Sequence, residues 1–219
     1  MMQKLKRVFR GIQHLFSWFF FEKPKGLDFS LRDLNHVKGG YNGYAATSWK
    51  AIKNIDQVLT LKNKAFLDIG SGKGFTVLNA YKLGARKSTG IEYNLHLHNI
   101  AQQNFTKLHL EKMISSVNED ALKFQEYAQY DVYFLFNPFE YHVYSKVIDR
   151  IFSQIDGTGK ERHIICYGDA NLECITVKPG AHLLYSGICP FRGNTINIFR
   201  IGMIDRKIKV KSARGKVNV

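Results

Sequence analysis

The feature that most constrains the fold is a glycine turn between a short apolar run and a helical pattern. Residues 65–69 read Ala-Phe-Leu-Asp-Ile, and Gly-Ser-Gly-Lys-Gly follows at positions 70–74. From residue 75 to residue 83 apolar side chains recur at helical spacing, and Gly84 ends the pattern. A buried strand, a tight glycine turn and a helix form the opening unit of a parallel sheet with crossover helices. The sequence therefore predicts an α/β fold.

The rest of the chain continues this alternation of strands and helices. Helical patterns cover residues 48–59, 95–105 and 141–155, and apolar strand patterns cover 88–92, 113–117, 131–136 and 163–167. Two further strand patterns, 182–187 and 195–201, are joined by a connection too short for a crossover helix, so they should pair antiparallel. The pattern predicts five parallel strands followed by an antiparallel C-terminal hairpin.

The glycine turn and two acidic residues favour an adenosine-containing ligand. Gly70 permits a sharp turn, Gly72 leaves bare backbone for a ligand, and Gly74 lets the helix pack close to the sheet. The glycine spacing differs from the dinucleotide motif G-x-G-x-x-G, and Lys73 does not stand in a P-loop. Glu92 ends the second strand, where a carboxylate can accept both ribose hydroxyls. Asp120 follows the third strand and is either an acceptor for an adenine amino group or a helix N-cap.

These motifs resemble the class I (Rossmann-like) S-adenosylmethionine-dependent methyltransferase family over about residues 40–202. The resemblance rests on F-L-D-I-G-S-G-K-G, G-I-E-Y-N, E-D-A and F-N-P-F at these intervals. It implies a doubly wound, mostly parallel sheet of seven strands in the order 3-2-1-4-5-7-6. It also implies S-adenosylmethionine as cofactor and S-adenosylhomocysteine as product. The implied cofactor-binding residues of the core are Asp68, Gly70, Ser71, Gly72, Glu92, Tyr93, Asp120, Ala121 and Asn137.

The segment before the core carries a second, narrower resemblance. Residues 39–49 read Gly-Gly-Tyr-Asn-Gly-Tyr-Ala-Ala-Thr-Ser-Trp. They are similar to a segment of a bacterial subgroup that is distantly similar to the non-SET histone-lysine methyltransferases. In that subgroup the loop closes over the cofactor, which implies that Tyr44 and Thr47 contact it. The alternative is an ordinary glycine-rich linker into a helix.

Asn137, Pro138 and Phe139 are the candidate catalytic residues. They follow the fourth strand at the carboxyl edge, where ligands of open α/β sheets bind, and an amide oxygen there can orient an amine. The run resembles the N-P-P-[YF] motif of amino-methyltransferases, but Phe139 replaces the second proline and Glu140 replaces the aromatic residue. This departure argues against stacking on a nucleobase. Three residues are candidates for proton handling or for a solvated helical turn: Glu140, Tyr141 and His142.

The sequence contains no pattern typical of a metal site or a disulfide framework. His96 and His98 stand two apart on a predicted helix and so point to different sides. The three cysteines, Cys166, Cys174 and Cys189, form no C-x-x-C pair, which favours a reduced, cytoplasmic setting.

The formal net charge of +14 predicts attraction to polyanions or, alternatively, solvated tails. Many cations lie near the two ends of the chain, at positions 4–10 and 206–216. The aromatic-rich run at positions 15–21 is too short to span a bilayer. Residues 1–25 are therefore interpreted as an interfacial helix on the inner face of an anionic membrane, or as a helix docked on the protein core.

The sequence predicts four regions. They are a basic and aromatic N-terminal helix (1–25), a cofactor-capping segment with a lead-in helix (26–62), a methyltransferase domain (63–204) and a basic C-terminal tail (205–219). The favoured function is methyl transfer to a nitrogen atom of a protein or another amine. The alternatives are a nucleic-acid N-methyltransferase, or a catalytically silent binding protein associated with membrane or nucleic acid. The glycine spacing disfavours a fourth hypothesis, a nucleotide-dependent oxidoreductase.

Overall fold

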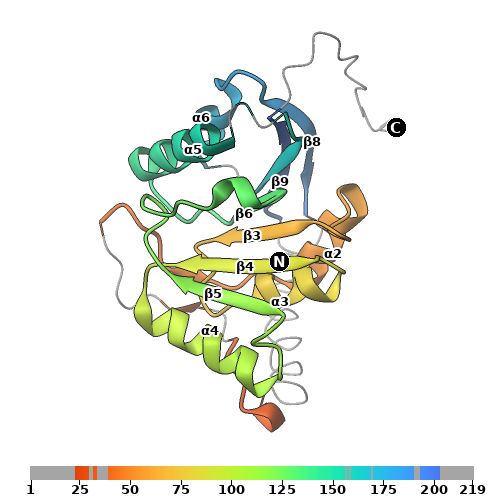
Figure 1. Ribbon diagram of the computed structural model, residues 1–219, viewed down its shortest axis with the longest axis vertical. Helices are drawn as coiled ribbons and strands as arrows, with labels where there is room; N and C mark the ends of the chain where they lie inside the picture. The colour runs from red at the N-terminus through yellow and green to blue at the C-terminus, as the bar shows by residue number, and fades with distance from the viewer. Residues whose placement is uncertain are drawn as a thin grey trace, which may run out of the picture.

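A seven-stranded sheet forms the centre of the molecule (Figure 1). The computed structural model describes residues 23–29, 32–33, 39–155, 157, 159–168, 170–189 and 193–202. The sheet order is β5-β4-β3-β6-β7-β9-β8; β3 to β7 are parallel, and β9 is antiparallel to both of its neighbours. Counted from β3, this is the order 3-2-1-4-5-7-6, so the predicted fold is confirmed. The strands are β3 Ala65–Ile69, β4 Lys87–Glu92, β5 Ile114–Asn118, β6 Val132–Leu135, β7 Arg162–Tyr167, β8 His182–Ile188 and β9 Thr195–Ile201.

Helices cover both faces of the sheet. On one face, α5 (Tyr141–Ile155) packs its apolar stripe against β3, β6 and β7, and the short α6 (Glu173–Thr176) lies beside it. On the other face lie α2 (Trp49–Val58), α3 (Phe75–Lys82) and α4 (Leu95–Lys107). This double covering explains why every residue of β3 and β6 is buried, and why both read as continuous apolar runs.

The helix boundaries follow local signals in the sequence. Ser48 caps α2, because its hydroxyl accepts a hydrogen bond from the backbone nitrogen of Ala51 at 3.2 Å. Gly74 begins α3 in a left-handed conformation, and Asn94 caps α4 through two backbone nitrogens. Five short elements were not predicted: η2 Lys23–Lys25, β1 Arg32–Asp33, β2 Tyr44–Ala45, η3 Tyr127–Gln129 and α6.

One segment, residues 39–47, crosses the carboxyl edge of the sheet, and we call it the strap. It forms an antiparallel bridge between Tyr41 and Phe139. The Asn42 nitrogen donates to the Pro138 carbonyl at 2.9 Å, and the Glu140 nitrogen donates to the Gly40 carbonyl at the same distance. The strap is therefore tied to the turn that follows β6, about a hundred residues away in the sequence.

Most of the two predicted terminal regions lies outside the described residues. Of residues 1–25, the structure describes only Lys23–Lys25, which form η2, and it describes nothing of 205–219. Among the helices that are described, none is long and apolar enough to cross a bilayer.

Candidate functional site

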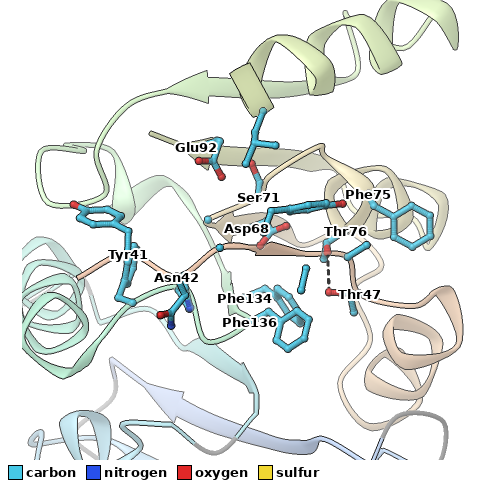
Figure 2. Close-up of a pocket in the computed structure, with 18 of the residues that line it drawn as sticks. Tyr41, Asn42, Thr47, Asp68, Ser71, Phe75, Thr76, Glu92, Phe134 and Phe136 are labelled. Carbon is cyan, nitrogen blue, oxygen red and sulfur yellow. Dashed lines mark hydrogen bonds between the residues drawn. The ribbon is translucent and has the colours of Figure 1, made fainter. Parts of the chain in front are cut away.

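A cavity lies at the carboxyl edge of the sheet, between the strap and the glycine turn (Figure 2). The space between its walls totals about 590 Å³, part of it open to solvent. Its lining includes nine of the residues predicted from the sequence: Tyr44, Thr47, Asp68, Gly70, Ser71, Glu92, Tyr93, Pro138 and Phe139. Four other predicted residues, Gly72, Asp120, Ala121 and Asn137, are not among the lining residues.

The glycine turn is bonded to the acidic end of the next strand. Gly70 and Gly72 have φ angles of 82° and 53°, which favour glycine. The Gly72 nitrogen donates to Glu92 Oε2 at 2.8 Å, and the Asn94 nitrogen donates to Oε1 at 2.9 Å. A Cβ atom on Gly72 would lie 2.0 Å from the ring of Tyr44. The turn and the strap thus approach each other so closely that only glycine fits between them.

Two buried carboxyl groups face the cavity. Burial and the nearby charge of Glu92 raise the pKa of Asp68 to about 8, although a hydrogen bond with Thr76 acts in the opposite direction. Burial also raises the pKa of Glu92, and the backbone hydrogen bonds from Asn94 and Gly72 partly offset this. The hydroxyl oxygens of Thr76 and Thr47 lie 3.4 Å apart, and the dashed line in Figure 2 joins them. A cationic ligand between Asp68 and the strap would relieve the cost of ionising this pair.

Asp120 is in contact with the strap. The Tyr41 hydroxyl donates to Asp120 Oδ1 at 2.6 Å, and the Leu122 nitrogen donates to the same oxygen at 2.9 Å. The ring of Tyr41 packs on the ring of Tyr93 with their centroids 4.5 Å apart. Ala121 is buried beside them, and its carbonyl accepts a hydrogen bond from Tyr127. The carboxylate predicted to meet an adenine amino group thus meets a tyrosine hydroxyl in this structure.

The amide that lines the cavity beside Pro138 belongs to Asn42. Its Nδ2 donates to the Asn137 carbonyl at 2.7 Å. The side chain of Asn137 packs elsewhere, since a Cβ atom on Gly168 would lie 2.3 Å from its Nδ2. Asn137 itself has a φ of 41°, a left-handed conformation that asparagine tolerates better than most residues.

The first turn of α5 is exposed to solvent. Glu140, Tyr141 and His142 all have exposed side chains, and Glu140 Oε2 lies 3.8 Å from His142 Nδ1. None of the three is among the residues that line the cavity. Their placement favours the solvated helical turn over a direct role in proton handling.

The sequence interpretation missed ten residues of the lining. Five of them lie within the glycine-rich segment, where neighbouring residues gave no indication of which ones face inward: Tyr41, Asn42, Gly43, Ala45 and Ala46. The other five sit on helices or strands, or directly after β6 in the case of Phe136, and which way they face depends on tertiary packing: Phe75, Thr76, Leu97, Phe134 and Phe136.

The described residues contain no group of three or more His, Cys, Asp or Glu side chains that could hold a metal ion. His98 Nδ1 lies 2.8 Å from the Ser116 hydroxyl. The three cysteines are buried as free thiols, and burial raises the pKa of Cys166 to about 12.

Comparison with known proteins places the fold among methyltransferases. The family model described as protein-L-isoaspartate(D-aspartate) O-methyltransferase matches residues 38–141. No curated protein sequence gives a significant match.

Several solved structures share the fold at low sequence identity. An RNA methyltransferase from Salinibacter ruber in complex with S-adenosylhomocysteine is 15% identical, with a TM-score of 0.56 over 77% of this chain and 100% of that chain. A putative methyltransferase from Escherichia coli is 16% identical, with a TM-score of 0.58 over 77% of this chain and 97% of that chain. Magnesium protoporphyrin IX methyltransferase from Synechocystis, solved with S-adenosylmethionine, is 13% identical, with a TM-score of 0.55 over 71% and 79%.

The chemistry of the cavity suits an adenosyl amino acid. The glycine turn leaves no space for a side chain of its own, and the charge that acts most strongly on the buried Asp68 carboxyl is another carboxylate, that of Glu92. The carboxylate of Glu92 accepts backbone hydrogen bonds from Gly72, Asn94 and Tyr93, and its two oxygens together retain lone-pair capacity for a ribose hydroxyl. By its sheet order the chain has the fold of the class I (Rossmann-like) S-adenosylmethionine-dependent methyltransferases, and residues 38–141 match a methyltransferase family model.

Proposed function

We propose that this protein is a methyltransferase, which transfers a methyl group from S-adenosylmethionine to a nitrogen atom of a protein side chain or of another amine. The observation that carries the proposal is the Asn42 amide, held on the Asn137 carbonyl at the cavity wall next to Pro138 and Phe139. Because its nitrogen is fixed in this way, its oxygen is left to accept a hydrogen bond from an amine and orient the nitrogen lone pair.

The cofactor-binding roles form part of the same proposal. S-adenosylmethionine supplies an electrophilic methyl group on a sulfonium ion. Asp68, positioned by Thr76, would hold the ammonium group, and Glu92 would hold the ribose hydroxyls. The backbone at Gly70, Ser71 and Gly72 would carry the methionine part once the ring of Tyr44, which packs on Gly72 in this structure, has moved aside. Tyr44 and Thr47 would then cover the ligand from the strap. Tyr93, Asp120 and Ala121 would receive the adenine once Tyr41 has moved.

The remaining lining residues would exclude water from the reaction. Phe75, Phe134, Phe136 and Phe139 present aromatic rings to the cavity, and the strap crosses above them. Exclusion of water strengthens the interactions that align the amine, and it protects the methyl group from hydrolysis. Alignment and desolvation are the main demands of this reaction on a protein.

The charge around the cavity favours a protein or amine acceptor over a nucleic acid. Near the carboxyl edge, the described loops that leave β3 to β6 carry three acidic residues, Glu119, Asp120 and Glu140. They carry two cations there, Lys73 and Lys123. Lys73 is buried and forms an ion pair with Asp28 at 2.8 Å. A nucleic-acid substrate calls for a cationic surface around the reacting base, because phosphate contacts supply most of the affinity.

A second candidate reaction is methyl transfer to a carboxyl oxygen. The matching family model, whose description names O-methyl transfer to isoaspartate, covers the strap, the glycine turn and the turn after β6. Carboxyl methyl esters and methylamines differ sharply in stability towards base, which allows one experiment to separate the two reactions.

Incubation of cell lysate with the enzyme and methyl-labelled cofactor should label a protein or small-amine fraction in a form that withstands mild base. N-methyl groups survive base, whereas methyl esters release labelled methanol. The lysate should be separated into protein, RNA, lipid and small-molecule fractions, with Asp68→Asn enzyme as the inactive control. Release of the label as methanol would establish the carboxyl reaction instead, and label confined to RNA would contradict both.

Tyr41→Phe is expected to tighten the binding of S-adenosylhomocysteine by about tenfold, because it removes the hydrogen bond that holds the strap on Asp120. Titration calorimetry measures the change. Tyr127→Phe is a matched control, since it also removes a hydroxyl hydrogen bond near Ala121 but does not touch Asp120. Weaker binding by the Tyr41 variant would show instead that its hydroxyl contacts the cofactor.

A further inference from the structure

The opposite edge of the sheet, where the parallel strands begin, gathers cations from distant parts of the sequence. They come from the ends of α3 and α4, from the loops that enter β3, β4, β5 and β7, and from η2. We call them the amino-edge cations, and their side chains are exposed: Lys25, Lys62, Lys82, Arg86, Lys107, Lys112 and Lys160. The exposed acids in the same described loops are fewer: Glu111, Glu126 and Glu161.

Contacts place five of these cations in two close groups, Lys25 with Lys82 and Lys107, and Arg86 with Lys160. The charge of Lys25 contributes to lowering the pKa of Lys82, after the larger effect of burial. Lys107 donates to the carbonyl of Gly26 at 2.5 Å, next to Lys25. Arg86 and Lys160 both bind the single carboxylate of Asp131. Because two cations share this one acid, the positive charge around Asp131 is only partly neutralised.

Both described ends of the chain lie at this edge. η2 begins at Lys23 and leads to the contact with Lys107, and a Cβ atom on Gly202 would lie 2.6 Å from the carbonyl of Lys160. The sequence before Lys23 contains Lys4, Lys6, Arg7 and Arg10 together with the aromatic run at positions 15–21. The sequence after Gly202 adds six further cations: Arg206, Lys207, Lys209, Lys211, Arg214 and Lys216.

We propose that the amino-edge cations form a docking surface for an anionic lipid bilayer, which leaves the cavity at the carboxyl edge facing away from the membrane. Charge alone would suit any polyanion. A run containing Phe16, Trp18 and three consecutive phenylalanines joined to this edge adds the apolar and aromatic chemistry that membrane interfaces bind and that a phosphate backbone does not require. The contrast in charge between the two edges orients the molecule on such a surface.

Co-sedimentation with vesicles tests this surface in the full-length protein. The probe is a vesicle of phosphatidylglycerol and phosphatidylcholine in equal amounts, and phosphatidylcholine alone serves as the uncharged control. The test variant carries Lys62→Glu, Lys82→Glu and Lys112→Glu. The matched control carries the same change of charge on exposed lysines away from this edge, Lys50→Glu, Lys123→Glu and Lys146→Glu.

The partition coefficient of the test variant on anionic vesicles is expected to fall about a hundredfold, and the control should keep most of its binding. Binding of the unaltered protein should weaken as salt is added and be much weaker on phosphatidylcholine. Equal loss in both variants, equal binding to the two vesicle types, or binding to a duplex RNA without binding to anionic vesicles would overturn the proposal. Melting curves and S-adenosylhomocysteine titrations of both variants confirm that loss of binding does not reflect unfolding.

Discussion

Asp68→Asn is expected to abolish cofactor binding and, at the same time, to make the free protein more stable above neutral pH. The buried carboxyl has a pKa of about 8, so its ionised form is disfavoured until a cation binds beside it. Without the carboxylate the ammonium group has no counter-charge, and affinity for S-adenosylhomocysteine should fall at least about a hundredfold. Titration calorimetry measures this loss.

The stability effect has a defined dependence on pH. Because the pKa of Asp68 is raised in the folded protein, the folded state binds a proton that the unfolded state releases between about pH 4 and pH 8. The free energy of unfolding of the unaltered protein therefore decreases as the pH rises through this interval. The amide that replaces the carboxyl group does not ionise, so near pH 8 the variant should be more stable, by an amount on the order of a few kcal/mol.

Asp131→Asn is the matched control, since Asp131 is also a buried aspartate but stands at the amino edge. Its pKa lies below the usual range despite burial, because the Ala65 nitrogen, Lys160 and Arg86 stabilise the charged form. Its contribution to stability is present above about pH 4 and is lost as the pH falls. The Asp131 variant should thus be less stable at neutral pH and bind the cofactor normally. Denaturant unfolding across the pH range compares the two variants, and the same sign of change at pH 8 in both would contradict this account.

Gly72→Ala is expected to remove cofactor binding and to destabilise the protein by about 1–3 kcal/mol. The backbone at this position has a φ of 53°, and the added Cβ would lie 2.0 Å from the ring of Tyr44. The variant should therefore push the strap away from the glycine turn and distort the backbone on which we propose that the methionine part lies. Thermal unfolding and S-adenosylhomocysteine titration measure the two effects separately.

A double variant separates the steric clash with Tyr44 from the effect of the added methyl group on cofactor binding. Tyr44→Ala added to Gly72→Ala removes the steric conflict between the ring and the new methyl group, so part of the stability should return. Cofactor binding should not return, because the methyl group remains on the turn. Restored binding in the double variant would mean that the Gly72 backbone does not contact the cofactor.

The strap connects the two halves of the candidate site. Tyr41 reaches Asp120 and Tyr93 on the adenine side, and Asn42 reaches the Asn137 carbonyl on the acceptor side. Adjacent residues of one segment thus contact both ends of the cavity. Movement of Tyr41 to admit an adenine would also displace Asn42, the next residue in the chain. Cofactor binding would thereby be coupled to the position of the Asn42 amide, which we propose orients the methyl acceptor.

The local sequence determined the elements and their order. The apolar run 65–69 became β3 with the same limits, the stripe at 141–155 became α5, and the last two strands paired as the hairpin. These elements could be predicted because burial of one or both sides of a helix or strand makes apolar side chains recur at a regular spacing along the sequence. The proximity of Gly72 to Glu92 could also be predicted, because the loops after parallel strands all lie at the carboxyl edge of the sheet.

Tertiary structure alone decided which side chains meet across long sequence separations. Nothing near Tyr41 or Asn42 indicates that they contact Asp120 and Asn137, because the strap has no hydrophobic period and is held by hydrogen bonds to loops that are distant in the sequence. The side chain of Asn137 packs against Gly168, at the end of a strand that lies about thirty residues further along the chain. The amino-edge cations likewise meet only because the helices run back against the strands and return their ends to one edge.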